Sequence, residues 1–173
     1  LSLSLSLSLS LSLSLSLCIY ALWYIFPGAG TVYDTHTKHA VGTARYTVNY
    51  ALASLLYGEP AHKDLCAHGV AFLMERQLDR DYGGFAWVLN GNTVQDGDKW
   101  CYSVAFGLLA LANAHRAGVD GAAAHIATVH ALAEEKYYEP AHGLYIDSFP
   151  RDFSAPALYR GQNANMHMCE AQV

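Results

Sequence analysis

Hydrophobic residues between positions 37 and 57 recur at intervals of three and four, the spacing that puts them on one face of a helix. The pattern stops at Gly58. A second helix is predicted over residues 60–78, and its start is indicated by Pro60, because proline is favoured in the first turn of a helix. A short apolar run at 85–89 then leads to Asn-Gly-Asn at 90–92, a sequence typical of tight hairpins. The pattern therefore predicts two helices followed by a short β-hairpin.

The same order of elements then occurs a second time. Helices are predicted at residues 98–116 and 122–137, and an apolar run follows at 144–146. Gly58 and Gly118, which end the first helix of each pair, are 60 positions apart. A unit of helix, loop, helix and extended link is thus repeated along the chain.

A helical hairpin with one apolar face cannot bury that face alone, so such units stack or close into a ring. Six of them close an (α/α)6 barrel, which needs on the order of 350 to 400 residues. Residues 32–173 hold two pairs and the start of a third, near Asn163. We therefore expect this range to be all-α, a partial (α/α)6 barrel of helical hairpins with short β-hairpin links. This would be the N-terminal half of a six-hairpin toroid, with a large apolar edge exposed.

Residues 1–31 differ in composition, since Leu and Ser alternate without exception from Leu1 to Leu17 and an apolar linker follows. A signal peptide carries a basic residue ahead of its apolar stretch, but the first Lys or Arg is Lys38. A membrane span needs about 20 mostly apolar residues, and a strand with this alternation would be long and unpaired. Because a translated CT dinucleotide repeat also gives alternating Leu and Ser, we expect an artefactual or disordered segment and no membrane partner.

The charge and cysteine content narrow the function classes. Ten Lys and Arg against 15 Asp and Glu give a net charge of −5, and the basic residues are scattered, which argues against a nucleic-acid partner. The four cysteines lie far apart and form no C-x-x-C pair, so neither a zinc site nor a disulfide framework is predicted. Reduced thiols and a cytoplasmic location are the expectation.

The densest group of polar residues lies at positions 159–171, at the start of a predicted helix. Asn163, His167 and Glu170 are spaced i, i+4 and i+7 and so share one face. An amide, an imidazole and a carboxylate together can hold sugar hydroxyls, because each can make hydrogen bonds. On spacing alone an equal alternative is that Asn163 or Asn165 caps the helix and His167 is a core residue. No second histidine lies at i+4 from His167, so a zinc site is not favoured.

Residues 160–171, with Asn163, Met166-His167 and Glu170-Ala171, resemble the N-x-x-M-H-x-x-E-A motif of the N-acylglucosamine 2-epimerase family. The resemblance is to its mannose isomerase and sulfoquinovose isomerase branch. Residues 39–45, 83–87 and 99–106 resemble, in the same order, an inner helix, a short hairpin and the next inner helix of that family. The similar region covers about 37–171.

The resemblance implies an (α/α)6 barrel enzyme that needs no metal or nucleotide cofactor and acts on a monosaccharide. The reaction would open an aldose ring and pass through an enediol, with the proton returning to C1 in an isomerase or to C2 in an epimerase. Arg45 matches the arginine that contacts the substrate oxygens near the reacting carbons. Tyr102, Asn163 and His167 match positions that line the sugar pocket, and Glu170 is the acid on the same helix turn.

The chain also departs from the family pattern. The two histidines that exchange the proton in this family belong to later repeats, beyond Val173, so no residue is assigned a catalytic role, and Val41 stands where the family usually has Trp. We therefore expect a truncated fragment that binds sugar weakly or not at all and has no turnover. The sequence leaves open the particular sugar, the choice between isomerase and epimerase, and the oligomeric state.

Two other functions fit a six-hairpin fold. A glycoside hydrolase needs two carboxylates about 5 to 9.5 Å apart across a sugar cleft, and the polar cluster supplies only Glu170. A non-catalytic helical-repeat binding module would have a concave surface without converging polar groups. The presence of Arg45, Tyr102 and His167 on successive inner helices favours the isomerase or epimerase.

Overall fold

The computed structural model describes residues 24–25 and 32–173. The expectation for residues 1–31 therefore lies, apart from Tyr24–Ile25, outside the described residues. Those two residues form β1, which pairs antiparallel with β2 (Val32–Asp34). In the part of the chain that the structure describes, no helix is both long enough and apolar enough to span a membrane.

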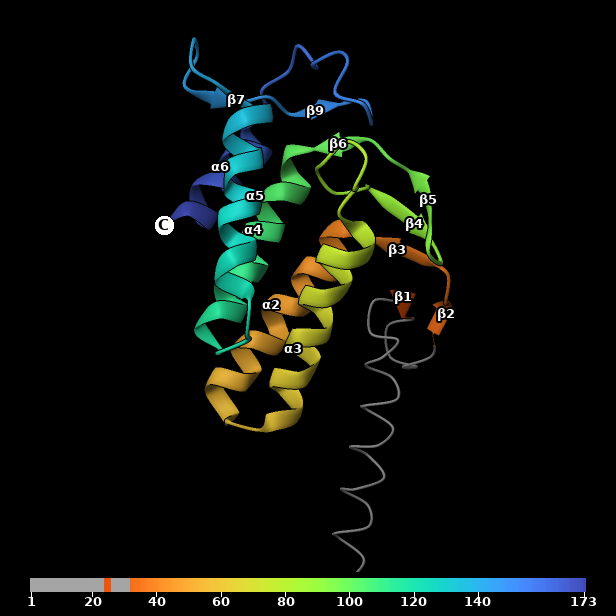
Figure 1. The fold of residues 1–173 in the computed structure, drawn as a ribbon, viewed down its shortest axis with the longest axis vertical. Coiled ribbons are helices and arrows are strands. Elements are labelled where there is room, and N and C mark those ends of the chain that lie inside the picture. Colours follow the sequence, from red (N-terminus) through yellow and green to blue (C-terminus); the bar gives the residue numbers. More distant parts are fainter. Residues whose placement is uncertain (1–23, 26–31) are drawn as a thin grey trace, which may run out of the picture.

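Two helix pairs and the first helix of a third alternate with short strands (Figure 1). The helices are α2 (Ala40–Tyr57), α3 (Pro60–Phe72), α4 (Cys101–Arg116), α5 (Ala122–Lys136) and α6 (Gln162–Gln172), and a π-helical turn, η1 (Leu73–Gln77), extends α3. The strands are β3 (Thr37–His39), β4 (Val88–Asn90), β5 (Thr93–Asp96), β6 (Lys99–Trp100), β7 (Tyr138–Glu139), β8 (Leu144–Tyr145) and β9 (Ser148–Phe149). The predicted order of helices and links is confirmed.

The helices that open each pair begin later than their hydrophobic pattern predicts. Residues 37–39 pair with β4, so α2 begins at Ala40, and the His39 Nδ1 atom caps it by accepting the Val41 N–H at 3.3 Å. Residues 99–100 pair with β9, so α4 begins at Cys101. The residues predicted to form the first turn of each of these helices thus belong to short strands instead.

The short strands gather at the end of the bundle where α2 and α4 begin (Figure 1). β4 and β5 form the predicted hairpin, and β3 adds to it to give a three-stranded antiparallel sheet. β6 pairs with β9 and β7 pairs with β8, which connects the start of α4 to the chain that leads into α6. Residues far apart in sequence are therefore brought together at one end of the helices.

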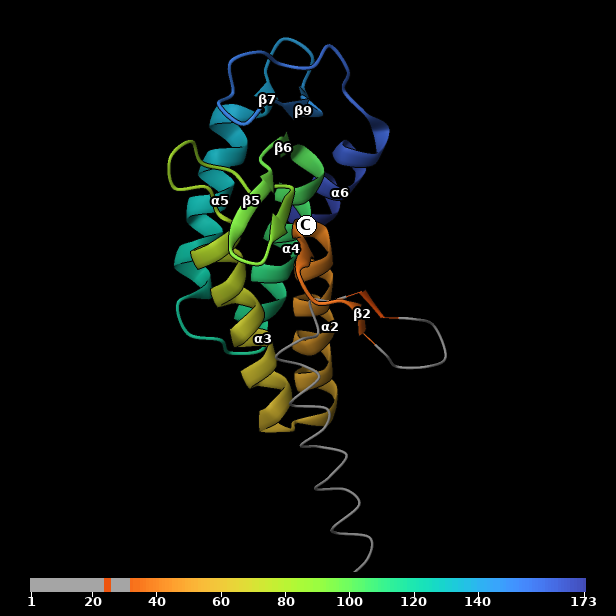
Figure 2. The ribbon, with the colours of Figure 1, turned by 90° about the vertical axis from the view of Figure 1, so that its right-hand side faces the viewer.

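The core lies around α4, which packs against α2, α5 and α6 (Figures 1 and 2). Phe85 is completely buried and lies against Gly107, where an added Cβ would be only 2.5 Å from the Phe85 ring. Apolar side chains are not buried at the C-terminal end of α2, where Leu52, Leu55 and Leu56 are 40 to 75% exposed. These three leucines are thus uncovered apolar residues, and they lie away from the strands.

A buried ion pair joins the two helix pairs to each other. The Lys99 ammonium lies 2.8 Å from the Asp79 carboxylate, and both side chains are almost fully buried. The Arg151 Nε atom donates to the same carboxylate at 2.7 Å, and the backbone N–H of Asp81 donates at 3.1 Å. Burial alone would raise the pKa of Asp79, but the hydrogen bonds from Arg151 and Lys99 outweigh it and hold this pKa well below its usual range. Asp79 is therefore an anion that depends on both cations.

We expect Asp79→Asn to lower the free energy of unfolding by about 3 kcal/mol near neutral pH, because it leaves the buried Lys99 ammonium unpaired. An acid whose pKa is lowered by folding stabilises the fold above its unfolded pKa of about 3.9 and loses that effect below it. The difference between parent and variant should therefore shrink as the pH falls below about 4.

Urea unfolding across this pH range measures the effect. Asp81→Asn is the control, because the Asp81 side chain is exposed and its ion pair with Arg151, at 3.5 Å, lies at the surface. We expect this variant to change the free energy of unfolding by less than about 0.5 kcal/mol. Equal losses in the two variants would contradict the role given to Asp79.

Candidate functional site

Three inner helices supply the predicted site residues. Arg45 lies in the second turn of α2, Tyr102 in the first turn of α4, and His167 near the middle of α6. The exposed Arg45 side chain donates from Nη2 to the Tyr102 hydroxyl at 2.9 Å. Its guanidinium carbon also lies 4.6 Å from the centre of the Phe106 ring, a cation–π contact. A hydrogen bond and an aromatic face thus fix the direction of this cation.

His167 completes the cluster from the other side. Its ring centre is 5.2 Å from that of Tyr102 and 4.6 Å from that of Phe106. Its Nδ1 atom is 2.7 Å from the Glu170 carboxylate, one helical turn further along α6. An ionised carboxylate only accepts hydrogen bonds, so Nδ1 carries a hydrogen and the Nε2 atom of a neutral ring is an acceptor. Glu170 therefore determines which tautomer His167 presents.

Phe106 is the member of this cluster that was not singled out from the sequence. It lies four residues after Tyr102, so the two side chains are on the same face of α4, and their ring centres are 4.9 Å apart. The i, i+4 spacing of two aromatic residues was the available signal. The structure thus brings Arg45, Tyr102 and His167 together around one ring, and Glu170 joins them through His167.

Asn163 lies apart from these four residues. It is exposed on the first turn of α6, and in the part of the chain that the structure describes its side chain has no hydrogen-bond partner. The alternative that Asn163 caps the helix is not observed, since α6 begins after Gly161 without a side-chain cap. Asn163 instead lines a cleft that it shares with Tyr102.

This cleft, which we call the tryptophan cleft, has a volume of about 370 Å³. It is lined by Trp87, Trp100, Tyr102, Asp147, Tyr159, Gly161, Asn163 and Ala164. The rings of Trp87 and Trp100 are 5.2 Å apart, and His39 contacts Trp87 edge-on at 4.1 Å. Burial lowers the pKa of His39, which favours the neutral ring at this position. The cleft therefore extends the Arg45 cluster with aromatic walls.

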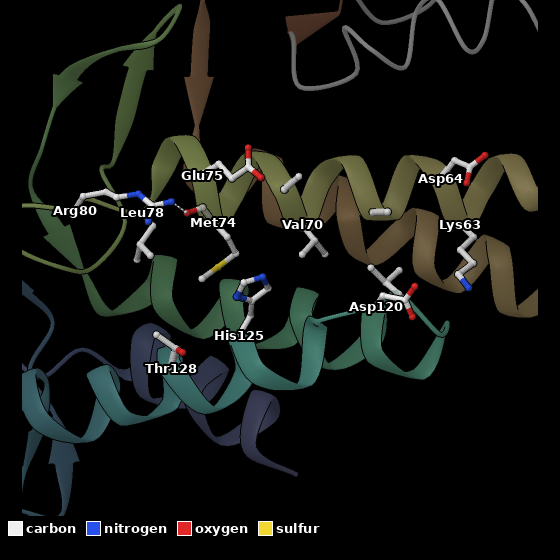
Figure 3. A pocket seen from close by; sticks show the side chains of 13 residues that line it. Lys63, Asp64, Val70, Met74, Glu75, Leu78, Arg80, Asp120, His125 and Thr128 are labelled. Atoms are coloured by element: carbon white, nitrogen blue, oxygen red, sulfur yellow. Dashed lines mark hydrogen bonds between the residues drawn. The ribbon is translucent and has the colours of Figure 1, made fainter.

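A larger cleft, of about 670 Å³, lies between α3 and α5 (Figure 3). Val70, Met74 and Leu78 line its floor, while charged side chains are spread along its rim instead of converging. None of the described residues that line it is Phe, Tyr or Trp. Within residues 24–25 and 32–173, no group of three His, Cys, Asp or Glu residues could hold a metal ion. Size alone therefore does not make this cleft the better candidate.

Comparison with known proteins identifies the family of the chain. The sequence pattern of the N-acylglucosamine 2-epimerase (GlcNAc 2-epimerase) family matches residues 23–173. The chain belongs to this family. A D-mannose isomerase of Marinomonas mediterranea is 40% identical over 146 residues, which are 84% of this chain and 37% of that protein. The chain thus spans about two fifths of the length of this relative.

Solved structures extend the comparison to the fold. The crystal structure of a D-mannose isomerase matches with a TM-score of 0.80 and 36% identity, over 91% of this chain and 42% of that one. A GH76 α-mannanase of Bacteroides thetaiotaomicron matches with a TM-score of 0.65 at 10% identity, over 88% of this chain and 47% of that one, which shows the fold alone. The predicted family and the partial (α/α)6 barrel are confirmed.

Asn165, two residues after Asn163, holds α6 in place through its side chain. Its side chain accepts from the Tyr145 N–H at 2.8 Å and donates to the Tyr145 and Gly161 carbonyls at 3.1 and 2.9 Å. These bonds attach α6 to β8. The sequence offered Asn165 only as a helix cap, and the structure gives it a tertiary role.

The two asparagines therefore form a matched pair for mutation. We expect Asn165→Ala to lower the free energy of unfolding by about 2 kcal/mol, because it leaves backbone groups of Tyr145 without partners. Asn163→Ala should change it by less than about 0.5 kcal/mol. Thermal or urea unfolding of both variants measures the difference, and equal effects would show that Asn165 does not hold α6 in place.

Proposed function

We propose that residues 32–173 form the sugar-holding wall of an isomerase or 2-epimerase that acts on mannose-like monosaccharides through an enediol. The observation that carries this proposal is the convergence of Arg45, Tyr102 and the His167–Glu170 pair around Phe106. The similarity to D-mannose isomerases supports mannose-like monosaccharides as the substrate class. Epimerisation at C2 remains the alternative reaction, because the family is named for a 2-epimerase.

The cluster has the groups that such a reaction needs in its binding step. The guanidinium of Arg45 is exposed and held in one direction, so it can stabilise negative charge on a sugar oxygen. The Tyr102 hydroxyl accepts from Arg45, which leaves its own hydrogen for a sugar oxygen. The Nε2 atom of His167 can accept from a sugar hydroxyl, because Glu170 takes the hydrogen on Nδ1.

The reaction begins with opening of the aldose ring to the free aldehyde. A base then removes the proton from C2, and the electron pair moves onto the carbonyl oxygen to give the enediolate, which becomes the enediol when that oxygen is protonated. The proton returns to C1 in an isomerisation, which yields the ketose, or to C2 in an epimerisation. Arg45 stabilises the developing oxyanion in this scheme. The family resemblance assigns the proton transfer to residues outside this chain.

The rival functions have less support. A hydrolase acting through paired carboxylates would need two acids that face each other across the site. Glu170 instead contacts the His167 ring, and Asp147 lies in the adjoining tryptophan cleft. A binding module without catalysis gives no reason for a cation and an oriented imidazole to converge. The likeness to a mannanase is at the level of the fold.

A titration of the chain with D-mannose, followed by NMR, tests the proposal. We expect Arg45→Met to weaken binding at least tenfold, since a hydrogen bond to a charged group contributes about 1.5 to 3 kcal/mol. Arg116→Met is the matched control, because Arg116 ends α4 and, among the described residues, its side chain hydrogen-bonds only to Asn113, so the affinity of this variant should not change. Absence of any mannose-dependent shift, or equal affinities for both variants, would overturn the proposed function.

Turnover by the chain itself is a separate prediction. In D2O we expect neither D-fructose nor deuterium at C2 of D-mannose, because no residue of the cluster is assigned the proton transfer. The ¹H NMR spectrum of the sugar reports both products. Either product above a buffer control, and lost in a His167→Asn variant, would show that His167 itself moves the proton.

A further inference from the structure

We propose that Asp147 is a further sugar-binding residue, which fixes one hydroxyl of the sugar against the wall formed by Trp87 and Trp100. The inference rests on the proposed function and names a specificity-determining group for it. Asp147 lines the tryptophan cleft together with Tyr102 and Asn163. It was not among the site residues expected from the sequence.

The backbone of Asp147 is held beside the start of α4. Its carbonyl accepts the Cys101 N–H at 2.9 Å, and its own N–H donates to the Tyr159 carbonyl at 3.1 Å. The next residue, Ser148, pairs with Trp100 in the β6–β9 ladder. Asp147 is therefore fixed on both sides, one residue before β9, which pairs with the strand that carries Trp100.

Its carboxylate has more acceptor capacity than the described residues use. One partner is the backbone N–H of Gly161. Residue 161 must be small, because an added Cβ would lie 2.4 Å from Asp147 Oδ1. Within residues 32–173, no Lys, Arg or His side chain forms an ion pair with Asp147. A carboxylate has about four lone-pair positions, so acceptor positions remain for a ligand.

Burial raises the pKa of Asp147, and the Gly161 N–H opposes this rise without cancelling it. A half-buried carboxylate that lacks a cation is costly to keep unless a donor completes its hydrogen bonds. A sugar hydroxyl is such a donor. The missing partner is thus of the kind that the proposed substrate carries.

The aromatic walls explain why the donor would be a sugar. Trp87 and Trp100 lie with their ring centres 5.2 Å apart, and both line the cleft. Ligand sites combine apolar aromatic surface with a few fixed polar groups that set orientation. A sugar ring has C–H groups on its faces and hydroxyls at its edge. Asp147 beside two indoles matches that division and would select the configuration of a single hydroxyl.

A purely structural role makes a different prediction. If Asp147 only satisfies the N-terminus of α6 through Gly161, its replacement would change stability and leave sugar affinity intact. Asp147→Asn separates the roles, because an amide oxygen can still accept the Gly161 N–H. Loss of the charge near the helix start should lower Tm by about 2 to 4 °C whichever role holds.

The test is a D-mannose titration of the parent chain, Asp147→Asn and the control Asp152→Asn, up to about 100 mM sugar, because millimolar binding corresponds to only about −4 kcal/mol. The indole N–H signals of Trp87 and Trp100 report binding. Asp152 is exposed in a loop, and its carboxylate accepts the Ser154 N–H. We expect Asp147→Asn to weaken binding about tenfold and Asp152→Asn to leave it unchanged.

A series of monodeoxy mannoses gives the second measurement. One of them should bind equally well to the parent and to Asp147→Asn, because it lacks the hydroxyl that Asp147 holds. An unchanged affinity in Asp147→Asn, or the same loss with every deoxy sugar, overturns the role of Asp147. If Arg45→Met still weakens binding in that case, the proposed function stands without it. Absence of mannose binding to the parent chain overturns both.

Discussion

The contact between Asp79, Lys99 and Arg151 joins three parts of the chain that are distant in the sequence. Asp79 follows the first helix pair, Lys99 begins β6 just before α4, and Arg151 lies in the segment that leads to α6. Both cations share one nearly inaccessible carboxylate, and loss of Asp79 would leave the fully buried Lys99 ammonium without a counter-charge. The contact therefore holds together the end of the barrel where β3 to β9 gather.

That arrangement determines the position of the candidate site. Lys99 is followed by Trp100 and Tyr102, so the anchored strand places one wall of the tryptophan cleft and the hydroxyl that accepts from Arg45. α6 is attached separately, through the Asn165 side chain and the Tyr145 backbone. The site is therefore supported by polar contacts behind it, which leaves Arg45 and Asn163 exposed toward a ligand.

Much of the fold could be predicted because its determinants are local. Helical periodicity, the proline of α3 and the 60-residue spacing from Gly58 to Gly118 give the pairs and their order. The boundaries at Ala40 and Cys101 could not be predicted, since the preceding residues are drawn into strands by partners about 50 residues away. The i, i+3 contact of His167 with Glu170 follows from helix geometry, but Phe106 as its neighbour does not.

The sequence by itself determined the repeated helical hairpins, the family motif on α6 and the candidate residues Arg45, Tyr102, Asn163, His167 and Glu170. Only the tertiary structure decided that Arg45, Tyr102 and His167 meet around Phe106. It also placed Asn163 in the adjoining cleft with Asp147. The attachment of α6 through Asn165 was likewise visible only in the structure. The reason is that periodicity reports which face of a helix is buried, whereas the partner across that face is set by packing between elements distant in the chain.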